Sequence, residues 1–182
     1  MHQSVITPVS IVETRGCKFV IFDAPNDANL PMYLQELTKL SVAHVVRVCD
    51  PTYGTRPLEE AGIEVHDWPF PDGDPPPDNI ISKWLGLVKS TFVDKADPPK
   101  KSIGIHCVAG LGRAPVLVAI ALIEKGMDPL DAVQVRACLI ASLCPHLRAK
   151  TIRGRRRGAI NAKQLSFLES YKRKSKKDCC VM

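Results

Sequence analysis

The sequence predicts an α/β domain built on a mainly parallel sheet. Short runs rich in β-branched residues alternate with stretches whose apolar residues recur at helical spacing, which is typical of strand–helix–strand units. The chain has 182 residues, 45% hydrophobic and 24% charged, which suits one filled core and excludes a mostly disordered chain. Its apolar runs are too short to span a membrane, and its N-terminus lacks the layout of a secretory signal. With seven cysteines, an odd count, we expect reduced thiols.

Four segments are expected to form strands, because each is a short apolar run bounded by turn residues. They are 18–22 (KFVIF), 45–49 (VVRVC), 63–67 (IEVHD) and 102–106 (SIGIH). Ligands of parallel sheets bind at the carboxyl ends of the strands, so chemistry is expected directly after these segments.

Five helices are expected between and after the strands. Three are indicated by apolar residues, at 30–40, at 81–92 and in the longest apolar run, 114–123. Asp128 followed by Pro129 marks another helix start, because aspartate caps free N–H groups and proline fits the first turn. Asn161 with Gln164 three residues later resembles a capping box that opens the final helix.

The segment 106–113 (HCVAGLGR) lies where the strand 102–106 ends and the next helix begins. A loop that leads into a helix N-terminus collects free N–H groups and the positive end of the helix dipole, so it favours an anion. Glycines permit the tight curvature, and the planar guanidinium of Arg113 can bind two phosphate oxygens. We expect a phosphate to be surrounded by Val108, Ala109, Gly110, Leu111, Gly112 and Arg113.

Cys107 stands at the base of this loop, where the positive field should lower the thiol pKa from ~8.5 toward the ~3.5–7.5 of activated cysteines. A thiolate beneath a bound phosphate is placed for nucleophilic attack at phosphorus. The spacing of Cys107 and Arg113 alone is a weak signal in a chain with seven cysteines, and a buried cysteine with a surface arginine is the alternative. The preceding strand, the two glycines and the following helix favour catalysis.

The leaving oxygen of a phosphate ester needs a proton, so an acid is expected on a separate loop. The segment 68–73 (WPFPDG) follows a strand and offers Asp72, with Asp74 as the second candidate. The alternative interpretation is a solvated turn aspartate in a proline-rich loop.

The C-terminal end is strongly basic. Residues 148–182 carry 12 of the 25 Lys and Arg residues and two of the 19 acidic residues, a net charge of +10 against −4 for the rest. The last four residues, CCVM, form a C-a-a-X box that favours farnesylation of Cys179. The polybasic run 172–177 (KRKSKK) supplies the second signal that one lipid chain needs. An anionic membrane is therefore favoured over nucleic acid, since no aromatic residues interleave the charge; a nuclear localisation patch is expected if prenylation is blocked.

Four segments together resemble the phosphatases of regenerating liver (PRL), which are prenylated dual-specificity phosphatases. They are 106–115 (HCVAGLGRAP), 68–73 (WPFPDG), 155–161 (RRRGAIN) and the terminal CCVM. The resemblance implies a cysteine-phosphatase fold of the dual-specificity type over residues 1–171, followed by the tail 172–182. It implies Cys107 as nucleophile, Arg113 as phosphate ligand and Asp72 as general acid, with no cofactor and no metal. Phosphorylated proteins are the implied substrates, and phosphoinositides fit the same loop.

The resemblance implies further properties. PRL proteins form a reversible disulfide between the catalytic cysteine and a second cysteine whose position Cys49 matches; a buried core thiol is the alternative. They bind cyclin-M magnesium transporters, form homotrimers, are farnesylated and methylated, and act at the plasma membrane and early endosomes. Ala114 is a PRL trait where the wider group has a hydroxyl that helps the thiolate leave, so we expect slow phosphocysteine hydrolysis. A low-turnover regulator that binds the transporters is the second hypothesis.

Two features depart from the family pattern. Pro71 stands where family members usually have an acidic residue. This predicts that the acid loop, the segment 68–73 that carries Asp72, is stiffer than in the family. Deleting 136–151 (RACLIASLCPHLRAKT) restores the pattern, so we hypothesise a 16-residue insertion that comes from variant splicing or a mis-called intron and that disturbs transporter binding. Cys138, Cys144 and His146 within it have irregular spacing for a metal site, and we interpret them as inert.

Overall fold

The computed structural model describes residues 6–14, 16–93, 100–133 and 159–174. Five strands form one sheet in the order β1-β2-β5-β3-β4, and all neighbours are parallel except β1 and β2. The strands are β1 (Ser10–Thr14), β2 (Cys17–Phe22), β3 (Val42–Arg47), β4 (Glu64–Asp67) and β5 (Ser102–His106). The predicted α/β fold with a mainly parallel sheet is confirmed.

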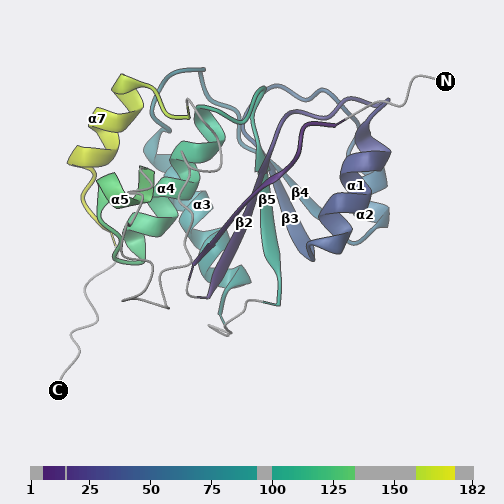
Figure 1. Cartoon of the computed structure of the whole chain (residues 1–182), viewed down its shortest axis with the longest axis horizontal. Coiled ribbons are helices and arrows are strands. Elements are labelled where there is room, and N and C mark those ends of the chain that lie inside the picture. The colour runs from purple at the N-terminus through teal and green to yellow at the C-terminus, as the bar shows by residue number, and fades with distance from the viewer. Residues whose placement is uncertain (1–5, 15, 94–99, 134–158, 175–182) are drawn as a thin grey trace, which may run out of the picture.

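Helices cover both faces of the sheet, in three layers (Figure 1). One face carries α1 (Leu30–Lys39) and α2 (Arg56–Glu60), and the other carries α3 (Asp78–Thr91), α4 (Arg113–Glu124), α5 (Pro129–Val133) and α7 (Ala162–Ser170). Two apolar clusters fill the spaces between the layers, one on each side of the sheet. The domain therefore has the sandwich arrangement that a parallel sheet needs to bury both of its faces.

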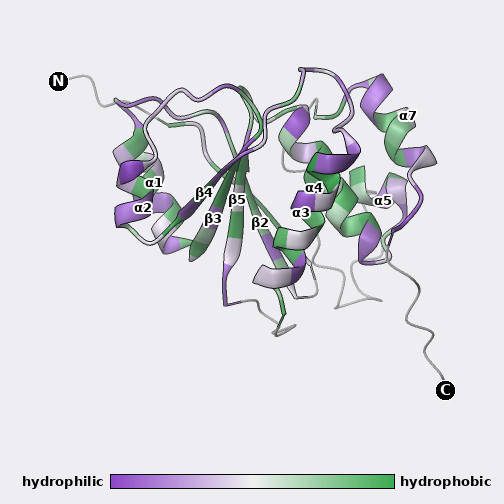
Figure 2. Cartoon of the chain, turned by 180° about the vertical axis from the view of Figure 1, so that it is seen from behind, coloured by the Kyte–Doolittle hydropathy of each residue, from purple (hydrophilic) through white to green (hydrophobic). Residues whose placement is uncertain are grey.

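The helix α4 lies at the centre of the larger helical layer. Every residue from Arg113 to Ile123 is buried, and Figure 2 shows the helix as mostly hydrophobic between α3, α5 and α7. The Trp84 indole of α3 donates a hydrogen bond to the Leu117 carbonyl at 2.6 Å, which fixes α3 against α4. The apolar run was correctly predicted to be a buried helix. Within the described ranges, no helix combines the length and apolar character needed to cross a membrane.

Some boundaries differ from the prediction. The strand β3 covers Val42–Arg47, whereas the sequence predicts a strand at 45–49. Its pairing begins at Val42 with β5 and at His44 with β4, before the predicted start. After Arg47, the Val48 N–H donates one hydrogen bond to the His106 carbonyl at 3.0 Å. The strand β1 and the helix α2 were not predicted, since each has only five residues and short elements carry little periodicity. The capping box at Asn161 and Gln164 is present as expected.

Several predictions concern residues outside the described ranges. These are the insertion 136–151 with Cys138, Cys144 and His146, the basic residues 155–157, and the lipidation site Cys179. The described cysteines, Cys17, Cys49 and Cys107, are buried and free of disulfide bonds.

Candidate active site

The predicted phosphate loop connects β5 to α4 at the carboxyl end of the central strand. Gly110 has φ 61°, a left-handed conformation that favours glycine, so the curvature expected of this residue is observed. Gly112 has φ −116° and is the N-cap of α4. A Cβ there would lie 3.7 Å from Asp72 Oδ1 and 3.5 Å from Gln164 Nε2, so this glycine marks a close approach of two other elements.

Two carbonyl groups of the loop point outward into neighbouring segments. The Val108 carbonyl accepts a hydrogen bond from the Ala24 N–H at 2.9 Å, and the Leu111 carbonyl accepts one from the Ile160 N–H at 2.7 Å. The C=O and N–H of a trans peptide point in opposite directions, so the N–H groups that follow these carbonyls face the inside of the loop. This orientation suits an anion at the loop centre.

Ile160 holds the outer side of the loop in an uncommon conformation. Its φ is 67°, which is a left-handed value rarely adopted by a β-branched residue. Such strain persists only where the surroundings impose it. The contact places the chain segment before α7 directly against the phosphate loop.

Cys107 lies at the base of the loop, and only 3% of it is exposed. The side chains of Val108 and Leu111 are the exposed apolar part of the loop, at 61% and 40%. The thiol is therefore recessed below exposed apolar residues of the loop.

Arg113 and Asp72 face each other beside the loop. The Arg113 side chain is 9% exposed, and its Nε lies 3.1 Å from Asp72 Oδ1. Its Nη1 donates to the Phe70 carbonyl at 3.2 Å, which ties the guanidinium to the acid loop. Within the described part of the chain, Nε has an ion pair but no hydrogen bond of good geometry. A buried N–H without a hydrogen bond is a group that a phosphate oxygen would satisfy.

The two acid candidates have different environments. Asp72 is 76% exposed and pairs with Arg113 of the phosphate loop. Asp74 instead pairs with Lys163 of α7 at 2.6 Å. The geometry therefore brings Asp72, and not the Asp74 carboxylate, to the site.

The acid loop is attached to the start of α7. The Asn161 side chain donates to the Gly73 carbonyl at 3.0 Å, and the Gln164 side chain donates to the Asp74 carbonyl at 3.2 Å. These two residues also cap α7, so one local structure holds the helix and the loop. These contacts hold the acid loop and were not revealed by the sequence, while the stiffness expected from Pro71 stays a prediction.

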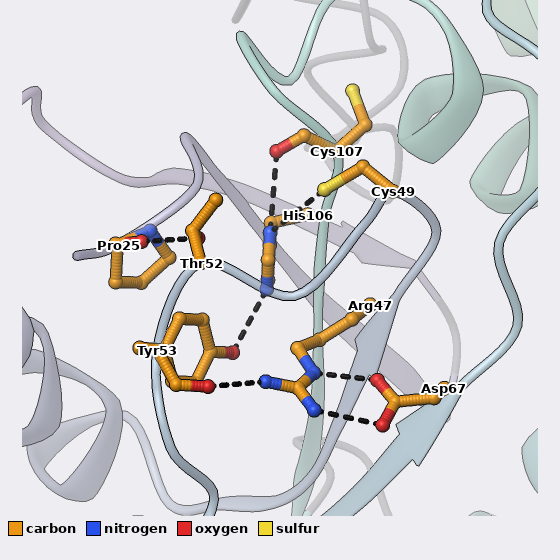
Figure 3. Close-up of polar contacts among 8 residues, drawn as sticks. All are labelled: Pro25, Arg47, Cys49, Thr52, Tyr53, Asp67, His106 and Cys107. Carbon is orange, nitrogen blue, oxygen red and sulfur yellow. Dashed lines mark hydrogen bonds and ion pairs between the residues drawn. The ribbon is translucent and has the colours of Figure 1, made fainter. Parts of the chain in front are cut away.

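A buried polar chain supports the loop from below (Figure 3). The His106 Nδ1 lies 3.2 Å from the Cys107 carbonyl, and Nε2 lies 2.8 Å from the Tyr53 hydroxyl. Because a carbonyl can only accept, Nδ1 carries the hydrogen and Nε2 accepts from Tyr53. Burial lowers the pKa of His106 to about 4, so the ring is neutral at pH 7.

Arg47 and Asp67 complete this chain. The guanidinium donates to both oxygens of Asp67, at 2.5 and 2.7 Å, and to the Tyr53 carbonyl at 2.7 Å. The hydrogen bond from Arg47 lowers the pKa of Asp67. Sequence reasoning missed this network; its one local signal was a charged residue, Arg47, inside the apolar run VVRVC.

Cys49 lies next to the phosphate loop. Its Sγ is 4.0 Å from His106 Nδ1 (Figure 3). It follows Val48, whose N–H donates to the His106 carbonyl at 3.0 Å. Burial raises the pKa of the Cys49 thiol. The end of β3 therefore brings a second, protonated thiol to the end of β5, where Cys107 begins the loop.

Comparison with known proteins gives close relatives. No protein-family model matches the chain. It is 53% identical to a probable protein tyrosine phosphatase type IVA A of Dictyostelium discoideum, over 100% of this chain and 98% of the relative. It is 44% identical to a PRL-1 phosphatase of Drosophila melanogaster, over 97% and 90% of the two chains. A solved structure, a putative protein tyrosine phosphatase of Leishmania major, has 40% identity and a TM-score of 0.73 over 92% of this chain and 100% of its own.

Proposed function

Because the chain belongs to the PRL family, the type IVA protein tyrosine phosphatases, we propose that it hydrolyses phosphorylated proteins through a slowly decaying phosphocysteine, while tethered to a membrane. It is a protein tyrosine phosphatase with the dual-specificity type of fold. The observation that carries the mechanism is the Arg113–Asp72 pair at the mouth of the loop that holds Cys107. It supplies a phosphate ligand and an acid beside one nucleophile.

In the first step, the phosphate of the substrate enters the loop, binds the Arg113 guanidinium and replaces Asp72 as its partner. The Cys107 thiolate attacks phosphorus while the bond to the ester oxygen breaks. Asp72, released from Arg113, acts as the general acid and gives a proton to the leaving oxygen. The products are a phosphocysteine and the free hydroxyl group of the substrate.

In the second step, water attacks the phosphocysteine. The Asp72 carboxylate takes a proton from the water, and the Cys107 sulfur leaves as a thiolate. Ala114 is fully buried in the first turn of α4 and has no hydroxyl to donate to this sulfur. We therefore expect the second step to limit turnover.

A burst experiment tests this mechanism. Rapid mixing with an aryl phosphate should release one equivalent of phenol per chain, followed by a slow steady state. Ala114→Ser should raise the steady-state rate toward that of the burst. Ala119→Ser is the matched control, because Ala119 is an equally buried alanine of the same helix remote from the loop. The mechanism fails if no burst occurs, or if Ala114→Ser leaves turnover unchanged while binding substrate normally.

Ala114 also favours a second candidate function, in which the protein acts as a low-turnover regulator. In that case the loop senses phosphate or redox state, and the protein acts by occupying a cyclin-M type magnesium transporter. A cellular effect that survives Asp72→Ala but is lost when a binding surface is altered supports the regulator. An effect that disappears with turnover supports the enzyme.

The membrane tether is proposed from the tail. Its first basic residues, Lys172, Arg173 and Lys174, are exposed, and each basic residue contributes about 1 kcal/mol near an anionic leaflet. A farnesyl group on Cys179 would add the lipid anchor at the cytoplasmic face of the plasma membrane and early endosomes, and the unprenylated chain would enter the nucleus. Farnesylated protein should sediment with phosphatidylserine vesicles. Cys179→Ser or high salt should prevent this; persistent binding of the unprenylated chain would contradict the proposal.

A reversible disulfide between Cys49 and Cys107 is proposed from their positions at the ends of neighbouring strands. Peroxide would oxidise the Cys107 thiolate to a sulfenic acid, and the Cys49 thiol would then displace water to form the disulfide. Mass spectrometry of peroxide-treated protein should find this bond, and Cys49→Ser should instead leave Cys107 over-oxidised.

A homotrimer, expected from the family, is tested by sedimentation equilibrium.

A further inference from the structure

A second cluster of chemically active side chains lies on the sheet, apart from the catalytic loop. His44 of β3 pairs in register with Glu64 of β4, and His66 follows two residues later on β4. Successive side chains of a strand alternate between faces, so Glu64 and His66 share one face with Trp68 beyond them. The three side chains come from segments 20 residues apart and converge only because β3 and β4 are neighbours.

The distances among the three side chains match a tetrahedral metal site. His44 Nδ1 lies 3.3 Å from Glu64 Oε2 and 3.3 Å from His66 Nε2, and His66 Nε2 lies 3.7 Å from Glu64 Oε1. Zinc binds such nitrogen and oxygen atoms at about 2.0–2.2 Å, which puts tetrahedral ligands about 3.3–3.6 Å apart. Small rotations would therefore suffice to seat a cation between the three groups.

The exposure of the three side chains also suits a cation. The imidazoles are mostly buried, with side chains 20% and 17% exposed, while the Glu64 carboxylate is 65% exposed at the rim. Lys101 lies near His44 and opposes the cation, whereas Asp67 beside His66 is already paired with Arg47 and contributes little.

We propose that His44, Glu64 and His66 form a site for a divalent transition metal of the zinc class, with water as the fourth ligand. Two histidines and one glutamate are a ligand set that zinc uses where one position stays open. The site is distinct from the phosphatase centre and requires none of its residues.

The site is connected to the acid loop through Trp68. The His66 ring packs at a tilt against the Trp68 ring, with centroids 5.2 Å apart, and against the His44 ring, with centroids 5.4 Å apart. Trp68 follows β4 and begins the segment that leads to Asp72. Metal binding would fix the His66 ring and, through it, Trp68 at the start of this loop.

The experiment titrates the full-length, reduced protein with Co²⁺, whose visible spectrum reports its ligands, and then displaces it with Zn²⁺. We expect a visible absorption band at one equivalent and a change in the tryptophan fluorescence, to which Trp68 contributes. The single variants His44→Gln, His66→Gln and Glu64→Gln should each bind at least tenfold more weakly. Glu13→Gln is the matched control, because Glu13 is an exposed glutamate on the opposite edge strand.

Each outcome decides for or against the site. Loss of the band in the three ligand variants, with retention in Glu13→Gln, supports it. A spectrum dominated by sulfur charge transfer, equal affinity in all variants, or no binding at millimolar Co²⁺ overturns it. If a histidine variant fails to fold by circular dichroism, Glu64→Gln decides alone, since its side chain is mostly exposed.

Discussion

His106→Asn should reduce the pH dependence of stability. Burial lowers the pKa of His106 from 6.5 to about 4 in the folded chain. Between these values the unfolded chain binds a proton that the folded chain does not, so the free energy of unfolding falls as the pH falls. The linkage relation gives a loss of about 2 kcal/mol between pH 7 and pH 5 from this residue alone. Asparagine does not titrate, so the variant lacks this contribution.

At pH 7 the same variant should be about 1–3 kcal/mol less stable than the wild type, because the buried Tyr53 hydroxyl loses its acceptor. The assay is urea unfolding at pH 7 and pH 5, followed by tryptophan fluorescence under reducing conditions. Contributions from His44, His66 and the carboxylates cancel in the comparison, because both proteins contain them.

Tyr53→Phe is the control for the pH effect. It removes the same hydrogen bond but keeps the buried imidazole, so it should lose stability at pH 7 and retain the wild-type slope. If His106→Asn and the wild type lose stability in parallel between pH 7 and pH 5, the reasoning from the buried neutral histidine is wrong.

Three further predictions follow from local geometry. Gly104→Ala should lower the free energy of unfolding in urea by about 1–3 kcal/mol, since a Cβ there would lie 3.2 Å from two core side chains. Gly86→Ala, in open space on α3, should raise it by about 0.5–1 kcal/mol, and equal effects of the two substitutions would contradict this. Asp72→Asn should lower turnover of alkyl phosphates about 10²–10⁴-fold and Asp74→Asn only slightly; the reverse order would move the acid to Asp74. Asn161→Ala should cost about 1 kcal/mol of stability and slow turnover, because it removes a helix cap and the bond to the acid loop; unchanged turnover would exclude a role for that bond.

Features that depend on neighbouring residues could be predicted from the sequence. The strand Ser102–His106, the loop after it, the buried helix α4 and the capping box at Asn161 all follow from contacts within a few residues. The position of the phosphate loop then follows from the strand and helix that flank it, because carboxyl ends of parallel strands are where such loops lie. The resemblance to the PRL family, carried by contiguous motifs, was confirmed by relatives at 53% and 44% identity.

The tertiary structure alone decided which distant groups meet. The sheet order β2-β5-β3-β4 places His106 beside Arg47 and brings His44 to Glu64 and His66. Contacts outside the sheet join Tyr53 to His106 and the acid loop to α7. Each of these contacts joins segments about 20 or more residues apart, and those within the sheet depend on strand register, which the local pattern does not specify. Local sequence thus determined the chemical groups of the phosphatase, whereas chain topology determined their support, the choice between Asp72 and Asp74 as the residue facing Arg113, and the histidine cluster.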